Sequence, residues 1–159
     1  MKKTFIYSLL MLLIPLCAAA PLGKSAFDMI SISADEAQED EQPGILHLKG
    51  NFLMQSSDWH LTSSQATVYG NLNRPDRIWL EGTPARFLVV PTGESEGDLI
   101  EATALVVEYV RETNKLTLSG GASLILGNEV IRSTNIEYDI NSNRYQAGGG
   151  VSIEVPPED

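Results

Sequence analysis

Apolar and polar residues alternate along most of this chain, and glycines interrupt the alternation at recurring points. The stretch KLTLSGGASLIL, residues 115–126, shows both properties, because apolar residues continue on either side of Gly120 and Gly121. Alternation with a period of two predicts β-strands. A glycine inside a continuing strand marks a bend, a bulge or a close approach of two backbones. The sequence therefore predicts strands that bend in their middle.

The alternating segments are short and are separated by polar turns such as QPG, RETN and NSN. They span residues 29–33, 44–55, 59–69, 77–90, 99–110, 115–126, 129–140 and 144–155. Many short strands with polar turns are typical of an all-β sandwich, barrel or solenoid. The acidic run DEAQEDE, residues 35–41, is interpreted as a solvated loop.

The interrupting glycines recur as a repeat. Gly50, Gly82 and Gly120 each follow a Leu-x pair, and Gly149 follows in QAGGGV. A second type of element, ending in a tyrosine, precedes three of them: SSQATVY, TALVVEY and STNIEY. A repeating glycine corner would fold every strand pair over, so that two sheets face each other and the units stack. The alternative is that the glycines are ordinary turn residues.

The alternation also assigns side chains to faces. Taking the leucine two positions before each glycine as inward predicts an apolar interior. The residues proposed to line this interior, and to contact a lipid if it is a groove, are Ile30, Ile32, Leu48, Phe52, Met54, Tyr69, Leu80, Phe87, Val107, Tyr109, Leu118, Leu124, Ile136 and Tyr138. Trp79 alternates outward, and Pro84 predicts a slip in register before Phe87. Whether the interior is an open apolar groove or a filled core stays open.

The first 19 residues read as a secretory signal peptide, with basic residues, an apolar run and then small residues. We expect cleavage after Ala19 and a single domain over residues 20–159; lipidation of Cys17 and a retained anchor are the alternatives. Cys17 is the one cysteine, so the mature chain has no disulfide. The net charge is −10, and loss of Lys2 and Lys3 makes it −12, which excludes binding to nucleic acid by charge.

Residues for catalysis or for a cofactor are not apparent in the sequence. His47 and His60 are the only histidines, no ligand set surrounds them, and no Gly-rich loop precedes a helix. The sequence therefore predicts neither an enzyme nor a metal or cofactor site.

Several segments, taken in order, carry a family resemblance. They are ISISADEA, LKGNFLMQSSDWHLTSSQATVY, GTPARF, IEATALVVEY, LTLSGGASLILGNEVIRSTNIEYD and SIEV, and they span residues 30–155. Together they resemble the LptA/OstA-like family of periplasmic lipopolysaccharide transport proteins. The resemblance implies a twisted open β-jelly roll (a β-taco) with an apolar interior. It implies lipid contact at Ile30, Ile32, Phe87 and Tyr109, on the match of MISIS, TPARF and VVEYV.

The resemblance also implies a location and partners. The location is the periplasm, and the ligand is lipopolysaccharide, with the acyl chains of lipid A inside the protein. Protein partners would be an inner-membrane bridge component and the outer-membrane translocon, both with domains of this fold; the extent of head-to-tail self-association stays open. The alternatives are a structural β-repeat module that binds envelope proteins without lipid, and an inner-membrane-anchored relative.

The two ends of the predicted stack are edges with unpaired backbone N–H and C=O groups. Such edges invite strand addition by another chain. The predicted docking edges are Ile30, Ser31, Ile32 and Ser33 at one end, and Val151, Ser152, Ile153, Glu154 and Val155 at the other.

Overall fold

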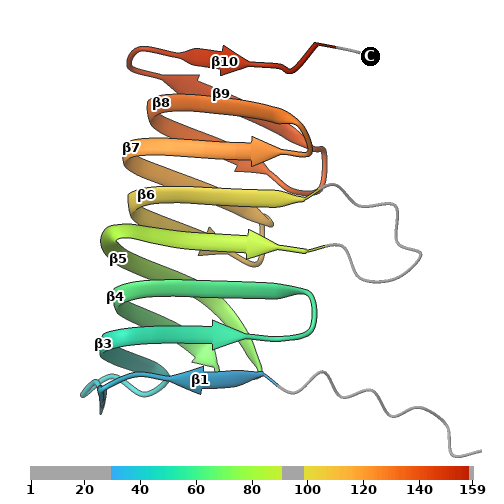
Figure 1. Cartoon of the computed structure of the whole chain (residues 1–159). Helices are drawn as coiled ribbons and strands as arrows, with labels where there is room; N and C mark the ends of the chain where they lie inside the picture. The colour runs from blue at the N-terminus through green and yellow to red at the C-terminus, as the bar shows by residue number, and fades with distance from the viewer. Residues whose placement is uncertain (1–29, 91–98, 158–159) are drawn as a thin grey trace, which may run out of the picture.

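The computed structural model describes residues 30–90 and 99–157, which form one antiparallel sheet of ten strands (Figure 1). The predicted signal peptide and its cleavage site lie outside the described residues. The strands are β1 (Ser31–Ser33), β2 (Glu36–Glu39), β3 (Ile45–Gln55), β4 (Trp59–Asn71), β5 (Arg74–Val89), β6 (Ile100–Val110), β7 (Lys115–Leu126), β8 (Glu129–Asp139), β9 (Arg144–Gly148) and β10 (Ser152–Glu154). They follow the order β1-β3-β4-β5-β6-β7-β8-β10, with β2 also paired to β3 and β9 to β8.

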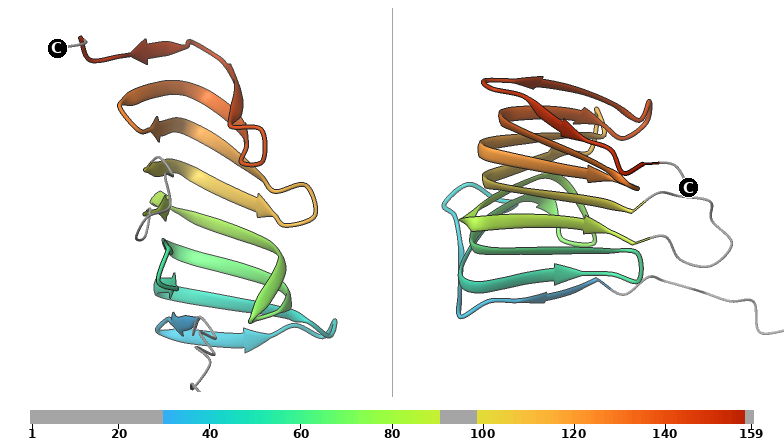
Figure 2. Two further views of the ribbon diagram at one scale, coloured as in Figure 1. Left: turned by 90° about the vertical axis from the view of Figure 1, so that its right-hand side faces the viewer. Right: turned by 45° about the horizontal axis from the view of Figure 1, so that its top comes forward.

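The sheet is folded over on itself. Each long strand crosses a corner on one side of the molecule, so a front and a back layer face each other, and the turns lie on the opposite side (Figures 1 and 2). The ladder shifts register in every pair at this corner, from β3–β4 through β7–β8. This arrangement confirms the predicted all-β, open jelly-roll fold.

The glycine pair of residues 120–121 forms the corner of β7. Both residues adopt positive φ, +82° and +64°, and the register shifts between Ser119 and Ala122. A Cβ on Gly120 would lie 3.0 Å from Leu105 on the neighbouring β6. Glycine is needed because it adopts positive φ without steric cost and lets the two corners stack closely.

The corner of β5 is built differently, with Gly82, Thr83 and Pro84. The Thr83–Pro84 peptide is cis, and pairing with β6 shifts between Glu81 and Ala85. Proline cannot donate to a ladder, so it is accommodated at this irregularity. The predicted slip in register before Phe87 is confirmed.

Two segments differ from the expectation. The acidic run 35–41 is not a continuous loop, because Glu36–Glu39 pairs with β3 as strand β2. All four of its side chains are exposed, so this segment pairs with β3 through its backbone while its acidic side chains stay in solvent. The last segment is also split: Gly149 and Gly150 both have positive φ and separate β9 from β10.

The hydrophobic core lies between the two layers and runs through the described stack. Inward positions of successive strands line up in register, as in the row Leu48, Ala66, Leu80, Val107, Leu118, Ile136 and Ala147. A single strand pair could not bury such a face, so stacking is what removes these side chains from water.

Candidate functional site

The interior between the two layers contains nearly all of the side chains that the alternation placed inward. The buried ones are Leu48, Phe52, Met54, Leu80, Phe87, Val107, Leu118, Leu124, Ile136 and Tyr138. Ile30, Ile32 and Tyr109 are partly buried and pack against this cluster. Their inward orientation agrees with the sequence analysis, while their contact with a ligand stays a prediction.

Tyr69 is the exception, because its predicted interior placement is wrong. The row that holds Tyr109 and Tyr138 continues through Ile78 to Val68, which is fully buried. The following residue, Tyr69, points to the outer face, where its ring centre lies 5.0 Å from Cζ of Arg77. The repeat of tyrosines in the sequence is therefore displaced by one residue in β4, which reverses the face.

The depth of the interior is filled. Leu118, Leu124 and Ile136, at the centre of β7 and β8, are almost fully excluded from solvent. Their neighbours in the same rows are also apolar, so this part packs as an ordinary core. Within residues 30–90 and 99–157, the centre of the stack is therefore closed by packed side chains.

The interior opens on the turn side, between the ends of the two layers. An apolar cavity of about 250 Å³ lies there, which we call the mouth cavity. Its lining is Ile30, Trp59, Leu61, Asn73, Arg74, Pro75, Ile78, Phe87, Val89, Tyr109, Arg111 and Ile140. The choice between groove and core thus has a mixed answer: the interior is packed at depth and open at the mouth.

Two aromatic side chains from different layers meet at the mouth cavity. The ring centres of Phe87 and Tyr109 are 6.0 Å apart, with planes inclined by 32°. The Tyr109 hydroxyl donates to Asn114 Oδ1 at 2.9 Å. Burial raises the pKa of Tyr109, and the nearby Arg111 opposes that rise, so the phenol is neutral in the physiological range.

Cationic groups stand at the polar rim of this apolar cavity. Arg111 donates from Nε to the Pro75 carbonyl at 3.0 Å and pairs with Asp76. Arg74 forms no ion pair among the described residues and is exposed. The sequence analysis missed these two arginines together with Trp59, Val89 and Ile140. The turn NLNRPD was the available signal, because a turn that closes a strand pair also borders the opening.

The two ends of the sheet carry the predicted docking edges. Among the strands of the described residues, β1 pairs only with β3 and β10 only with β8, so each has a side that no described strand covers. The exposed fractions of Val151, Ile153 and Val155 are 49%, 50% and 69%. Ile153 continues the inner row that holds Ile131, so the last layer of the interior ends in solvent.

Residues 30–90 and 99–157 contain no cluster of three or more His, Cys, Asp or Glu side chains that could hold a metal ion. In the same part of the chain, no helix long and apolar enough to cross a membrane was found.

These observations define an open, folded-over β-jelly roll with an apolar interior and an apolar mouth. Residues 31–144 match a family model described as LptA/(LptD N-terminal domain) LPS transport protein, and the chain belongs to this family. The family resemblance seen in the sequence is confirmed.

One relative is similar to the chain in both sequence and structure. It is 23% identical over 127 residues to the lipopolysaccharide export system protein LptH of Pseudomonas aeruginosa, a match that covers 79% of this chain and 71% of the relative. The crystal structure of LptH, the LptA homologous periplasmic component of the conserved lipopolysaccharide transport device of that organism, is similar with a TM-score of 0.71 and 20% identity. This match covers 82% of this chain and 96% of that one, and it supports the fold.

Proposed function

We propose that this chain is a periplasmic lipopolysaccharide-binding transport protein that shields acyl chains in its interior and bridges transport components of the two membranes. The observation that carries the proposal is the apolar mouth cavity, which opens between the two layers at Phe87 and Tyr109. The membership in a family of lipopolysaccharide transport proteins supports the same conclusion.

Binding would draw its free energy from the acyl chains. Each buried CH2 group contributes about 0.8 kcal/mol, and association has its own entropic cost, so affinity requires that many methylenes enter the interior together. The net charge of −10 cannot attract a phosphorylated head group over a distance. Arg74 and Arg111 would instead act locally, at the rim where the head group leaves the cavity.

A charge placed in the mouth tests the proposal. Tyr109→Glu puts a carboxylate against the acyl chains, which disfavours their burial by several kcal/mol, so binding of lipopolysaccharide should be lost. Thr103→Glu is the matched control, because Thr103 lies on the same strand between the buried Ala102 and Ala104 and faces outward. Circular dichroism checks folding. Equal binding by both folded variants would contradict the proposal.

The protein partners would be domains of the same fold on the inner-membrane component and on the outer-membrane translocon. We expect them to extend the sheet at β1 and β10, because these edges have unpaired backbone groups and the C-terminal edge exposes apolar side chains. The same geometry would join two copies head to tail. Ile153→Asp should weaken the two contacts made at β10, that with the partner domain and that with a second copy, whereas Ser152→Asp on the other face of β10 should weaken neither. Co-purification and the elution volume are the measurements.

We propose no catalytic role, since the family is described by transport. A structural module without lipid, and an anchored relative, are the alternatives that the sequence left open. Neither gains support from the family or from the relatives found.

A further inference from the structure

A second cavity lies on the outer face of the back layer, and its lining is polar and aromatic. It measures about 330 Å³ and is formed by β3, β4 and β5. The side chains that matter for its chemistry are His47, Lys49, Gln65, Tyr69, Trp79 and Glu81. We call it the outer-face pocket. It is distinct from the apolar mouth cavity, because these six side chains alternate with the buried positions of the same strands.

An aromatic stack borders this pocket. Cζ of Arg77 lies 5.0 Å from the ring centre of Tyr69 and 5.4 Å from that of Trp79. Arg77 also donates to Glu108, and the Trp79 indole N–H donates to Glu81 at 2.8 Å. The rings are therefore held in place before any ligand arrives, which lowers the entropic cost of binding.

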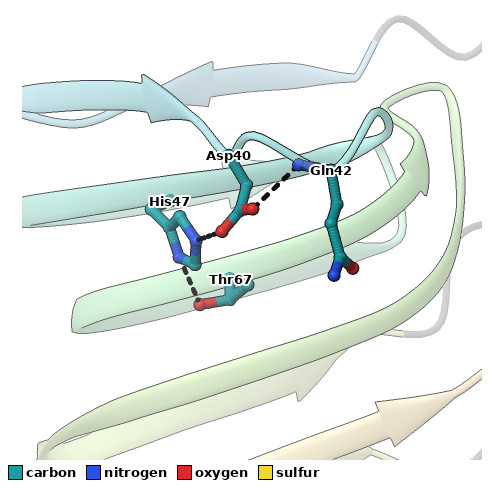
Figure 3. A network of polar contacts seen from close by, with 4 residues as sticks. All are labelled: Asp40, Gln42, His47 and Thr67. Atoms are coloured by element: carbon teal, nitrogen blue, oxygen red, sulfur yellow. Dashed lines mark hydrogen bonds and ion pairs between the residues drawn. The ribbon is translucent and has the colours of Figure 1, made fainter.

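The opposite wall is held by a network around His47 (Figure 3). His47 Nε2 lies 2.9 Å from Asp40 Oδ2, and Nδ1 lies 3.2 Å from Thr67 Oγ1. A carboxylate only accepts, so Nε2–H donates to Asp40, and in the neutral ring Nδ1 accepts from the Thr67 hydroxyl. The backbone N–H of Gln42 donates to Asp40 Oδ1 at 2.9 Å and fixes the carboxylate.

The chemistry of the lining narrows the class of ligand. An acyl chain would leave these polar groups unsatisfied, and a bare anion would meet the carboxylate of Glu81 as well as the ammonium group of Lys49. A sugar ring has hydroxyls that both donate and accept, and a face of C–H groups that packs on an aromatic ring. Gln65 offers both hydrogen-bonding roles, Lys49 donates and Glu81 accepts. Trp79 supplies the flat apolar surface.

We propose that the outer-face pocket binds a saccharide. The site does not depend on the lipid-binding role of the interior, but it is placed close to the mouth. Arg74 and Pro75 line the mouth cavity and Arg77 lines the outer-face pocket, so only the rim of the back layer separates them. Two sources have the required chemistry: the glycan part of lipopolysaccharide, whose lipid would lie in the mouth, and a glycan strand of the cell wall.

The two tryptophans make a matched pair of reporters for the test. The chain has two, Trp79 at the outer-face pocket and Trp59 at the mouth cavity. Trp59→Phe leaves Trp79 as the one tryptophan, and Trp79→Phe leaves Trp59; excitation at the red edge of the spectrum avoids the tyrosines. Each protein is titrated with lipopolysaccharide oligosaccharide freed of its acyl chains and, separately, with peptide-free glycan oligomers of the cell wall. We expect at least one saccharide to change the emission of Trp79 and neither to change that of Trp59.

A substitution inside the pocket then measures the contribution of one contact. Gln65→Ala, made in the Trp59→Phe protein, should weaken saccharide binding about fivefold, the loss of about one neutral hydrogen bond. Ser64→Ala is the control, since the exposed Ser64 is the neighbouring residue outside the pocket, and it should leave the affinity unchanged. The saccharide that binds identifies the source.

The inference is overturned if neither saccharide changes the emission of Trp79 at millimolar concentration, or if Gln65→Ala and Ser64→Ala bind equally. A titration with intact lipopolysaccharide shows whether a failure of this inference also affects the proposed function. A response of Trp59 to intact lipopolysaccharide, with no response of Trp79 to any saccharide, would leave the lipid-binding role standing and remove the saccharide site.

Discussion

Replacing each glycine of the β7 corner by alanine should give two different losses of stability. Gly120 and Gly121 are adjacent and both adopt positive φ, but their surroundings differ. A Cβ on Gly120 would meet Leu105 at 3.0 Å, whereas a Cβ on Gly121 meets nothing within 4 Å. The comparison therefore separates the cost of the backbone conformation from the cost of the close approach between β6 and β7.

The magnitudes follow from these two terms. Positive φ costs an alanine about 1–2 kcal/mol, and both variants incur this cost. Gly120→Ala also overpacks the corner against Leu105, which adds about 1–3 kcal/mol. Alanine reduces the entropy of the unfolded chain by the same amount at either position, so that contribution cancels in the comparison. We expect Gly120→Ala to be less stable than Gly121→Ala by about 1–3 kcal/mol.

Urea unfolding of both variants, followed by the strand signal in circular dichroism, measures the difference. The slope m should stay unchanged, because neither variant alters the surface exposed on unfolding. If Gly121→Ala lost as much stability as Gly120→Ala, stacked corners would not be the reason for the glycine pair.

Three further outcomes are expected. Val89→Trp should fill the mouth cavity and exclude about two CH2 groups of the acyl chains, which weakens lipopolysaccharide binding at least about tenfold. In the same binding assay, Val90→Trp at the next, exposed position should change the affinity little. Leu118→Ala should cost about 2–5 kcal/mol in urea unfolding, because it empties part of the filled core, while Thr117→Ala on the outer face should stay within about 1 kcal/mol. Hydrogen bonds from the Gln42 backbone and from His47 lower the pKa of Asp40 below 3.8, so its stabilising contribution is present above pH 3.8 and is lost as the pH falls through the folded-state pKa. The stability advantage of the wild type over Asp40→Asn in urea unfolding should therefore shrink in that acidic range, and a constant gap would refute the role of the carboxylate.

Most of the fold could be predicted because each strand has one buried face. In β7, the alternation of Leu116 and Leu118 before the corner, and of Ala122 and Leu124 after it, matches the buried positions. The glycine pair between them predicted the bend, because two successive residues of positive φ favour glycine.

The candidate site was only partly predictable. Tyr69 was assigned to the wrong face because it was aligned with Tyr109 and Tyr138, whereas the inward residue at this point of β4 is Val68. A shift of one residue along a strand moves a side chain to the other face. The mouth was missed because alternation tells which side chains point inward, but not where the two layers are far enough apart to leave a cavity. That separation is set by the packing of both layers, and it brings Trp59, Val89 and Ile140 together from distant parts of the chain.

The central claim is that lipopolysaccharide contacts the interior at the mouth cavity. A photo-crosslinking amino acid at Phe87, in living cells, tests it most directly, with the same amino acid at Thr103 on the outer face as the control. The account predicts a lipopolysaccharide adduct from position 87 and none from position 103. No adduct from position 87, or equal adducts from both, would contradict it.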